Sequence, residues 1–341
     1  DGGLAPWDGT NRYNYAPVNH FLRPIEQWSV GAFAEYELNE HFTPYFETMF
    51  ASNTSRAQIA ESGTFFVEAY ILDLDDFPEP FQAALVDEFG AGYDEFGVYV
   101  GKRNVEGGPR SDNTSHDAFR VVTGLKGDIN DAWSYDVSYL YANTRSTSTY
   151  VNDFFAPKIR KNIDPDTADI LYDVFTYQGV TPEQAAGLGG VGILNGNTST
   201  EVLQGFVTGD LFSLPTAGEP IKEVVGYEWR EENFERLADT VFEEGQLLGQ
   251  GGPTPSLVGG YNVTEFFGEA NVPLLDSLAL DLAYRYSDYS TVGGQDTYRL
   301  GLDWQPVDRA RFRVGFNRAV RAPNVSELYP VRHLGLRARA E

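Results

Sequence analysis

The 341-residue sequence contains no cysteine, one methionine and only four histidines. Without cysteine, disulfide bonds and thiolate metal sites are excluded. Basic residues are also scarce: 25 Lys and Arg stand against 50 Asp and Glu, which gives a formal net charge of −25. A chain of this charge has too few cations to neutralise a phosphate backbone, so the composition argues against nucleic acid as a partner.

Long hydrophobic runs are missing as well. No apolar stretch approaches the roughly 18 residues of a transmembrane helix, and the mean hydropathy is −0.34. A hydropathy scan would class such a chain as soluble, but the strands of a transmembrane barrel alternate weakly and contain no long apolar run. The sequence has neither an initiator methionine nor a signal peptide, so it is expected to be a mature form or a fragment.

What the chain does have is aromatics, at 14%, and 35 glycines, which together favour strands joined by turns. Several segments alternate between apolar and polar residues, among them 133–141, 277–289, 298–304 and 311–317. In residues 277–289 the apolar positions are Leu278, Leu280, Leu282, Tyr284 and Tyr286, and the others are Ala279, Asp281, Ala283, Arg285 and Ser287. A period of two predicts strands with one apolar and one polar face.

Two architectures use such strands. In a soluble sandwich the apolar face points inward, whereas in an outer-membrane barrel it faces lipid and the polar face lines the lumen. Aromatics at the ends of the apolar faces, such as Trp133 and Trp304, favour the membrane. In a membrane, the polar face must be the inner one, because each Arg facing lipid costs roughly 2–4 kcal/mol. The predicted lumen-facing residues are Asp281, Arg285, Arg299, Asp303, Arg311 and Arg313.

The lengths of the links between strands distinguish the two architectures better than the strands themselves do. About ten strands are predicted from the alternation, at 28–38, 42–52, 117–127, 131–143, 201–213, 221–234, 261–271, 278–288, 297–305 and 309–318. Short links alternate with longer ones, the last of which is a medium loop at 290–296. This parity predicts an all-β, antiparallel transmembrane β-barrel segment with short periplasmic turns and long extracellular loops, forming part of a larger barrel. Residues 95–104 also alternate but break the parity, so they are predicted to form either an extracellular ribbon or an extension of a strand, and not a further wall strand.

Other motifs weigh little. Residues 187–192, GLGGVG, match a dinucleotide fingerprint but lack its strand–helix context, so a flexible loop is expected. The histidines show no metal-ligand spacing. An acidic stretch at 73–79 is expected to be a solvated loop rather than a calcium site, since it lacks the EF-hand pattern. Residues 164–175 and 181–187 are predicted to be short helices, the second opened by a capping box of Thr181 and Gln184. No catalytic residue, cofactor or metal site is predicted, and the chain is not expected to be an enzyme.

The segment 272–329 resembles the barrel of TonB-dependent outer-membrane receptors, notably the large proteobacterial members. The resemblance rests on a Pro-containing turn, the strand end RYSDY at 285–289, the glycines at 293–294, WQP at 304–306 and RAPNVSEL at 321–328. Segments further upstream, such as GKRNVEGGPR at 101–110, also look like this family. The motif residues are Arg321, Ala322, Pro323, Glu327 and Leu328. We expect them to be structural: Pro323 ends strand pairing at the base of a loop, and Arg321 and Glu327 anchor that loop to charged groups of the wall or of the loops.

The resemblance implies a receptor that takes up a small nutrient, of the siderophore, cobalamin or oligosaccharide class, across the bacterial outer membrane. Its partners would be outer-membrane lipid, the nutrient, and a TonB-type energy complex that acts through an N-terminal plug. Residues 1–341 show neither plug nor final strands, so they are expected to be a partial barrel, and the sequence after Tyr329 is expected to leave the family pattern. Two alternatives remain open: a passive outer-membrane pore, or a soluble secreted all-β carbohydrate-binding protein or hydrolase.

Overall fold

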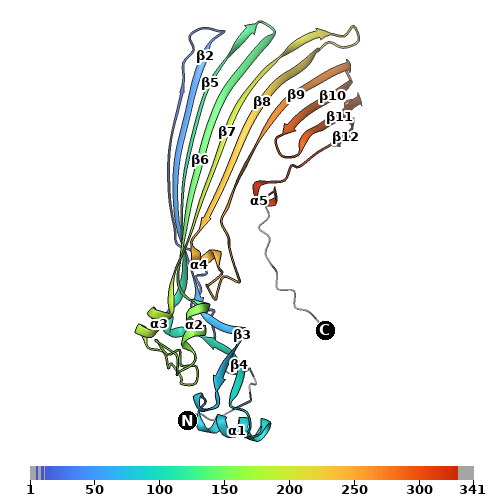
Figure 1. Ribbon diagram of the computed structural model, residues 1–341. Coiled ribbons are helices and arrows are strands. Elements are labelled where there is room, and N and C mark those ends of the chain that lie inside the picture. Colours follow the sequence, from blue (N-terminus) through green and yellow to red (C-terminus); the bar gives the residue numbers. More distant parts are fainter. Residues whose placement is uncertain (1–4, 7–8, 11, 329–341) are drawn as a thin grey trace.

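The chain folds into one large antiparallel sheet. The computed structural model describes residues 5–6, 9–10 and 12–328, and in it ten strands pair in the order β1-β2-β5-β6-β7-β8-β9-β10-β11-β12 (Figure 1). Their bounds are Ile25–Glu35 (β1), Thr43–Glu61 (β2), Pro109–Asn130 (β5), Trp133–Phe154 (β6), Gly189–Ser213 (β7), Pro220–Ala238 (β8), Leu257–Leu275 (β9), Leu278–Tyr289 (β10), Gly293–Val307 (β11) and Ala310–Arg318 (β12). The ten predicted wall strands are therefore confirmed, in chain order.

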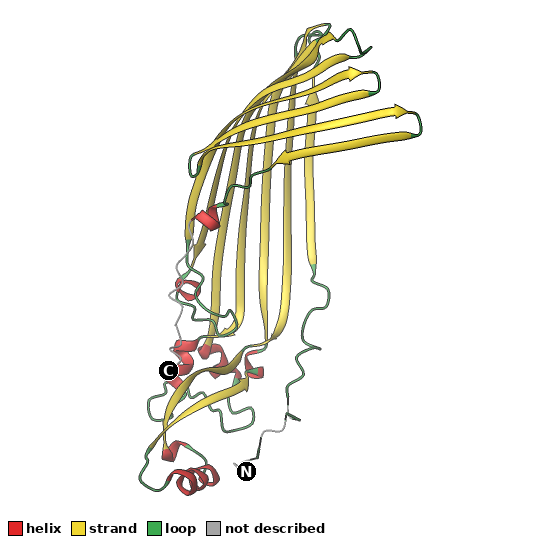
Figure 2. Ribbon diagram, turned by 90° about the vertical axis from the view of Figure 1, so that its right-hand side faces the viewer, coloured by secondary structure: helices red, strands yellow, loops and turns green. Residues whose placement is uncertain are grey.

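The sheet is a curved wall with two free edges. Its outer strands are β1 and β12, and no pairing joins these two strands within the described residues. Figure 2 shows the open side of the wall, with most helices gathered at one end. Unpaired strand edges cannot persist in lipid, so a sheet of this kind needs further strands before it can close in a membrane.

The links fall into two sets, one at each end of the sheet. One end, here called the turn end, carries the links 36–42, 131–132, 214–219, 276–277 and 308–309. The other, the loop end, carries the long links 62–108, 155–188 and 239–256. The predicted parity is confirmed with one correction: the link 290–292 is short, because β11 already begins at Gly293, whose φ of +71° suits a tight turn.

The strands are longer than predicted, because pairing continues beyond the alternating segments. The extended parts near the loop end, such as 52–58, 110–117 and 143–149, are polar on both faces. Register nevertheless joins them residue by residue: Thr54 pairs with Ser115, which pairs with Thr147, which pairs with Asn195. Alternation marks only the part of a strand that has one apolar face, so it missed this polar half of the wall.

The loop end carries a small substructure with its own core. Strands β3 (Gly63–Asp73) and β4 (Glu95–Arg103) form a separate two-stranded ribbon, accompanied by two 3₁₀ turns at Leu74–Asp76 and Val105–Gly107. The helices here are α1 (Glu79–Phe89), α2 (Ala156–Asn162), α3 (Pro182–Leu188) and α4 (Thr240–Glu243). Buried side chains from the ribbon, β6 and the 155–188 link pack into one cluster around Phe154, Ile159, Tyr172 and Leu188. Of the two alternatives predicted for residues 95–104, the ribbon outside the wall is confirmed.

Of the local predictions at the loop end, one is confirmed and two are wrong. Helix α3 forms with its capping box, in which Thr181 and Gln184 bond reciprocally. The helix predicted at 164–175 is absent, because the Asp164 side chain accepts bonds from Asp166 N and Thr167 Oγ1 and closes a turn instead. The predicted flexible loop at 187–192 is also wrong, since residues 189–192 open strand β7. No helix in the described part of the chain is long and apolar enough to cross a membrane.

Candidate functional site

The two faces of the wall differ sharply in chemistry. The register places the alternating apolar residues of neighbouring strands on the same side, which we call the apolar face. Large side chains stand exposed on it, including Trp28 on β1, Tyr139 on β6, Leu203 on β7, Val225 on β8, Phe266 on β9, Leu300 on β11 and Val314 on β12. Phe33 and Met49 are exposed apolar residues on the opposite, polar face. Exposure of such a large apolar surface to water is unfavourable, so this face suits an apolar environment.

Every ion pair between the described wall strands lies on the polar face. Arg120 Nη1 lies 2.9 Å from Glu47 Oε2, and Lys126 Nζ lies 2.8 Å from Glu35 Oε2. On β8, Arg230 contacts Glu228 and Glu232. The opposite charges thus follow one side of the sheet from β1 to β12.

The six predicted lumen-facing residues share this polar face. Asp303 stands opposite Arg313 across β11 and β12, with Arg313 Nε 3.1 Å from Asp303 Oδ2, and Arg311 Nε donates to Asp303 Oδ1 at 2.8 Å. Asp281 accepts a bond of 2.7 Å from Asn271 Nδ2. One carboxylate therefore serves two guanidinium groups at the turn end of the last strands.

A second cluster holds Arg285. Its Nη1 lies 3.0 Å from Glu265 Oε2, while Ser287 Oγ donates to Glu265 Oε1 at 2.5 Å. Glu265 is only 3% exposed. The Arg285 guanidinium also lies over the Phe267 ring, 4.8 Å from its centroid. Strands β9 and β10 are therefore linked by a buried carboxylate with two side-chain partners.

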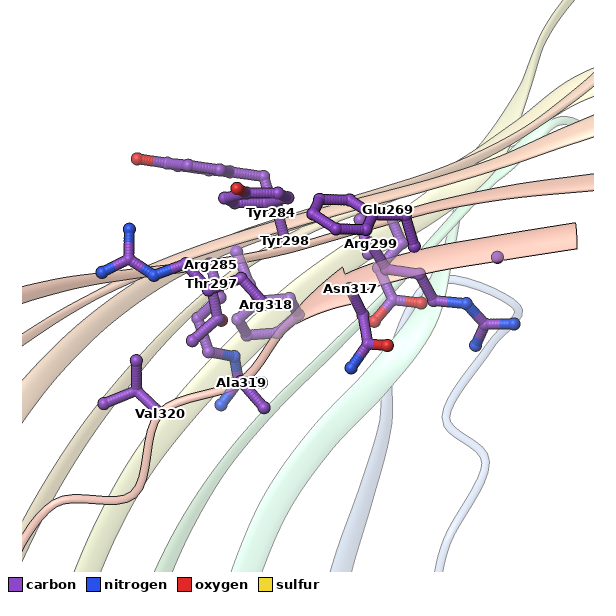
Figure 3. A pocket seen from close by; sticks show the side chains of 14 residues that line it. Glu269, Tyr284, Arg285, Thr297, Tyr298, Arg299, Asn317, Arg318, Ala319 and Val320 are labelled. Carbon is purple, nitrogen blue, oxygen red and sulfur yellow. The ribbon is translucent and has the colours of Figure 1, made fainter.

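Arg299, the remaining one of the six predicted residues, has no carboxylate partner of this kind. It lines a hollow of about 670 Å³ whose lining also includes Glu269, Tyr284, Thr297, Tyr298 and Asn317 (Figure 3). No hydrogen bond or ion pair joins the side chains of Arg299, Glu269 or Asn317 to another described residue. The polar face thus offers a cation, an anion and an amide that remain open to a ligand or an inner segment.

The motif after β12 forms a compact capped turn. The fork of Arg321 holds both carboxylate oxygens of Glu327, with Nη1–Oε2 at 3.0 Å and Nη2–Oε1 at 2.7 Å. Asn324 caps α5 (Val325–Leu328): its Oδ1 accepts from Glu327 N at 3.0 Å, and its own N donates to Glu327 Oε2 at 2.9 Å. The Arg321 fork and the Asn324 amide lower the pKa of Glu327 to about 2. Arg321 and Glu327 therefore anchor to each other, inside the motif.

The remaining motif residues hold this turn in place. Residues 319–323, which include Ala322 and Pro323, join the end of β12 at Arg318 to the cap at Asn324, so pairing ends before Pro323 and not at it as predicted. Leu328 ends α5, and its N–H donates to Asn324 O at 2.9 Å. Val325 is 7% exposed, and α5 contacts β9. Residues from Tyr329 onward lie outside the described part of the chain.

A buried polar network at the loop end was not predicted. Asp153 on β6, fully buried, accepts from Ser62 Oγ at 2.5 Å and from Gly249 N at 2.8 Å, which joins the links 62–108 and 239–256 to that strand. Arg110 Nη1 donates to Tyr150 Oη at 3.2 Å in the same region. Burial raises the pKa of Asp153, and the bonds from Ser62 and Gly249 act against that rise. The structural feature beside this network is a β-bulge at Asn152, where a φ of +63° turns the strand. Alternation in a single sequence does not reveal such a bulge.

The described residues contain no group of three or more His, Asp or Glu side chains arranged to hold a metal ion. The acidic stretch at 73–79 forms the end of β3, a 3₁₀ turn and the start of α1, with Asp76 Oδ2 accepting from Asp73 N at 2.8 Å.

Comparison with known proteins gives a consistent result. A family model described as TonB dependent receptor-like, beta-barrel matches residues 73–337, beyond Tyr329, where the sequence was expected to leave the family pattern. No curated protein matches. A mutant of the ferric enterobactin receptor PfeA from Pseudomonas aeruginosa is similar with a TM-score of 0.50 and 16% identity, covering 96% of this chain and 37% of that one. P. aeruginosa FpvA bound to a pyoverdine–iron complex gives a TM-score of 0.50 and 13% identity, over 84% and 34% of the two chains. The chain thus spans about a third of the length of these structures.

Proposed function

We propose that this chain, which belongs to the TonB dependent receptor-like β-barrel family, forms part of the wall of a receptor that takes up a nutrient across the outer membrane. Members of the family are outer-membrane β-barrel proteins of Gram-negative bacteria, and they are receptors and transporters rather than enzymes. The chain is accordingly an outer-membrane protein. Its partners in uptake would be a small nutrient, lipid around the wall, and a TonB-type energy complex that acts through a plug.

One observation carries the proposal. The apolar face of the wall exposes large side chains from β1 to β12, while the ion pairs between its strands all occupy the other face within the described residues. A soluble sandwich would bury the apolar face against a second sheet, and the described chain has no such sheet. The apolar face would contact lipid, and the polar face, with Arg285, Arg299 and Asp303, would line the lumen.

The proposal assigns the loop end to the cell exterior and the turn end to the periplasm. The 341 residues contain no cysteine, so each introduced cysteine is unique within this segment, and the unsubstituted full-length receptor gives the background labelling. Tyr177, 90% exposed, represents the loop end, and Ala217 in the 214–219 link represents the turn end. In intact cells that express the full-length receptor, a membrane-impermeant maleimide should label Tyr177→Cys and spare Ala217→Cys, and both should be labelled after lysis. Labelling of Ala217→Cys alone in intact cells would show that the proposed orientation is the wrong way round.

Uptake itself is tested in cells that lack the gene. Nutrient pools supplied singly as ferric siderophores, cobalamin or oligosaccharides should include one whose uptake requires both this gene and a working energy complex. Uptake that needs the gene but survives loss of the energy complex would indicate a passive pore instead. The ligand class is left to this experiment.

A further inference from the structure

The ribbon at the loop end has an unpaired edge that the wall does not use. Strand β4 (Glu95–Arg103) pairs with β3 on one side, and no third strand joins it within the described residues. Its nine residues are regular, whereas β3 is interrupted between Phe65 and Ala69. In Figure 1 the ribbon lies at the end of the molecule away from the turn end. Native proteins commonly cover or blunt such an edge.

The ladder shows which groups of β4 are free. Leu74 N donates to Asp94 O at 2.7 Å, and Asn104 N donates to Ser62 O at 2.8 Å, so even-numbered positions at both ends of β4 bond toward β3. Hydrogen-bonded and non-hydrogen-bonded pairs alternate in an antiparallel ladder. The N–H and C=O groups of the odd-numbered residues of β4 therefore point outward. These residues are Glu95, Gly97, Tyr99, Gly101 and Arg103, of which the first four are exposed.

The side chains of the ribbon give it one fixed face and one open face. Tyr70, Leu72 and Val100 belong to the buried cluster of the loop end and are at most 8% exposed. On the other face, Ile71 is 60% exposed and Tyr99 63% exposed. The ribbon is thus held firmly from one side, while its other side presents apolar surface next to the free edge.

Negative charge surrounds this surface. The link 62–108 carries ten acidic residues, Glu68, Asp73, Asp75, Asp76, Glu79, Asp87, Glu88, Asp94, Glu95 and Glu106, against two basic ones, Lys102 and Arg103. Both cations are already engaged: Lys102 Nζ lies 2.9 Å from Glu106 Oε1, and the Arg103 guanidinium lies over the Phe65 ring at 4.6 Å. A partner that approaches the tip of β4, near Asp73, Asp94 and Glu95, meets uncompensated carboxylates.

We propose that the free edge of β4 is a docking site for an extended, basic polypeptide segment of another molecule, which adds as a third strand to the ribbon. Main-chain bonds to Gly97, Tyr99 and Gly101 would supply affinity without sequence preference. Alternate apolar side chains of the segment would cover Tyr99 and Ile71, and its basic side chains would face the acidic tip. The proposal does not depend on nutrient uptake, because it concerns only the ribbon and its charge.

The test uses the full-length receptor in a non-ionic detergent and a fluorescein-labelled octapeptide of alternating Lys and Val. Fluorescence anisotropy should show saturable binding that weakens with added salt. The same peptide with every second backbone amide methylated keeps its charge but cannot pair as a strand, and should bind at least about tenfold more weakly. Equal binding of the two peptides would mean that charge alone explains the interaction, and it would overturn the proposal. An absence of saturable binding would overturn it as well.

Two substitutions localise the site. Tyr99→Pro removes an outward N–H from the free edge without breaking the ladder to β3, and proline is tolerated at such edge positions; binding should fall about tenfold. Ile71→Lys adds a positive charge to the open face and should weaken binding as well, even if Tyr99→Pro disturbs the ribbon. The matched control is Val258→Lys on β9, which is 62% exposed and adds the same charge outside the ribbon. Equal effects of Ile71→Lys and Val258→Lys would overturn the assignment, and so would self-association through this edge in sedimentation without peptide.

Discussion

Glu265 on β9 and Arg285 on β10 form an ion pair of which only one partner is buried. Arg285 Nη1 lies 3.0 Å from Glu265 Oε2; the Glu265 side chain is 4% exposed and the Arg285 side chain 41% exposed. Ser287 Oγ completes the environment of the carboxylate. A buried carboxylate with a half-exposed cation is held chiefly by its hydrogen bonds, so its loss should be felt more than the loss of a surface pair.

Glu265→Gln tests this relationship. The amide keeps the shape of the side chain but removes the charge that Arg285 and Ser287 bind, so the variant should lose about 1–3 kcal/mol of unfolding free energy. Thermal unfolding in detergent, followed by circular dichroism, measures the loss. The control Glu47→Gln removes the half-exposed partner of Arg120 and should cost less than about 1 kcal/mol. Equal losses would mean that burial of Glu265 contributes nothing.

Two buried tyrosines at the loop end form a matched pair. Tyr70 is 3% exposed, and its hydroxyl has no hydrogen-bond partner among the described residues, whereas the Tyr172 hydroxyl lies 2.8 Å from Thr64 Oγ1 and 2.7 Å from Asn104 Oδ1. Tyr70→Phe removes an unsatisfied group and should be neutral or stabilising. Tyr172→Phe leaves partners unpaired and should cost about 1–3 kcal/mol. Urea titration of the two variants, side by side, checks the order; the reverse order would show that the Tyr70 hydroxyl is satisfied in solution.

Gly249 is expected to tolerate no side chain. A Cβ there would overlap the Arg110 guanidinium of β5 and lie 2.9 Å from Asp153 Oδ2 of β6. Gly249→Ala must therefore displace these side chains, which lie against the 239–256 link. The expected cost is about 1–3 kcal/mol. Gly92→Ala is the control, since a Cβ at Gly92 meets nothing within 4 Å. Limited proteolysis should cut the 239–256 link faster in Gly249→Ala only.

The Arg321–Glu327 fork predicts a pH dependence with a defined sign. The Arg321 guanidinium lowers the pKa of Glu327 to about 2 in the folded state, below its ordinary value of about 4.3. The stabilisation is therefore complete above that ordinary value and is lost as the pH falls toward about 2. The carbon-13 shift of the Glu327 carboxyl, followed by NMR, should titrate with a midpoint near the low value. In Arg321→Gln the midpoint should rise toward the ordinary one; an unchanged midpoint would assign the shift to the Asn324 cap alone.

How far the sequence could predict this molecule differs between its two halves. Near the turn end, one face must be apolar and the other polar, so alternation located β10, β11 and β12 and the face of all six charged residues. Near the loop end, both faces are polar, and the buried contacts join segments distant in the chain, such as those that carry Ser62, Asp153 and Gly249. Period and propensity carry no information on such contacts, which is why β3, α1 and the buried network were missed.

The motif after β12 shows the same limit on a smaller scale. Its residue types indicated a structural turn, but the prediction that Pro323 ends pairing was wrong, because β12 already ends at Arg318. The partner of Arg321 could not be chosen from sequence, because a wall carboxylate and Glu327 were equally available. The structure adds the reason for the spacing: Asn324 and Glu327 form a reciprocal cap of α5, and that cap presents the Glu327 carboxylate to the Arg321 fork.

The assignment of the two faces is tested most directly by two neighbours on β12. Val314 is 69% exposed on the apolar face, and Gly315, on the polar face, has open space where a Cβ would stand, its nearest neighbour being Leu300 O at 3.9 Å. Arginine facing the hydrocarbon interior costs roughly 2–4 kcal/mol, whereas a lumen position tolerates it. Val314→Arg in the full-length receptor should therefore reduce stability and assembly in the outer membrane, and Gly315→Arg should assemble normally. Heat-modifiable mobility of outer-membrane fractions on gels measures assembly. A defect in Gly315→Arg alone would exchange the two faces, place Arg299 and Asp303 against lipid, and remove the basis for the proposed uptake function.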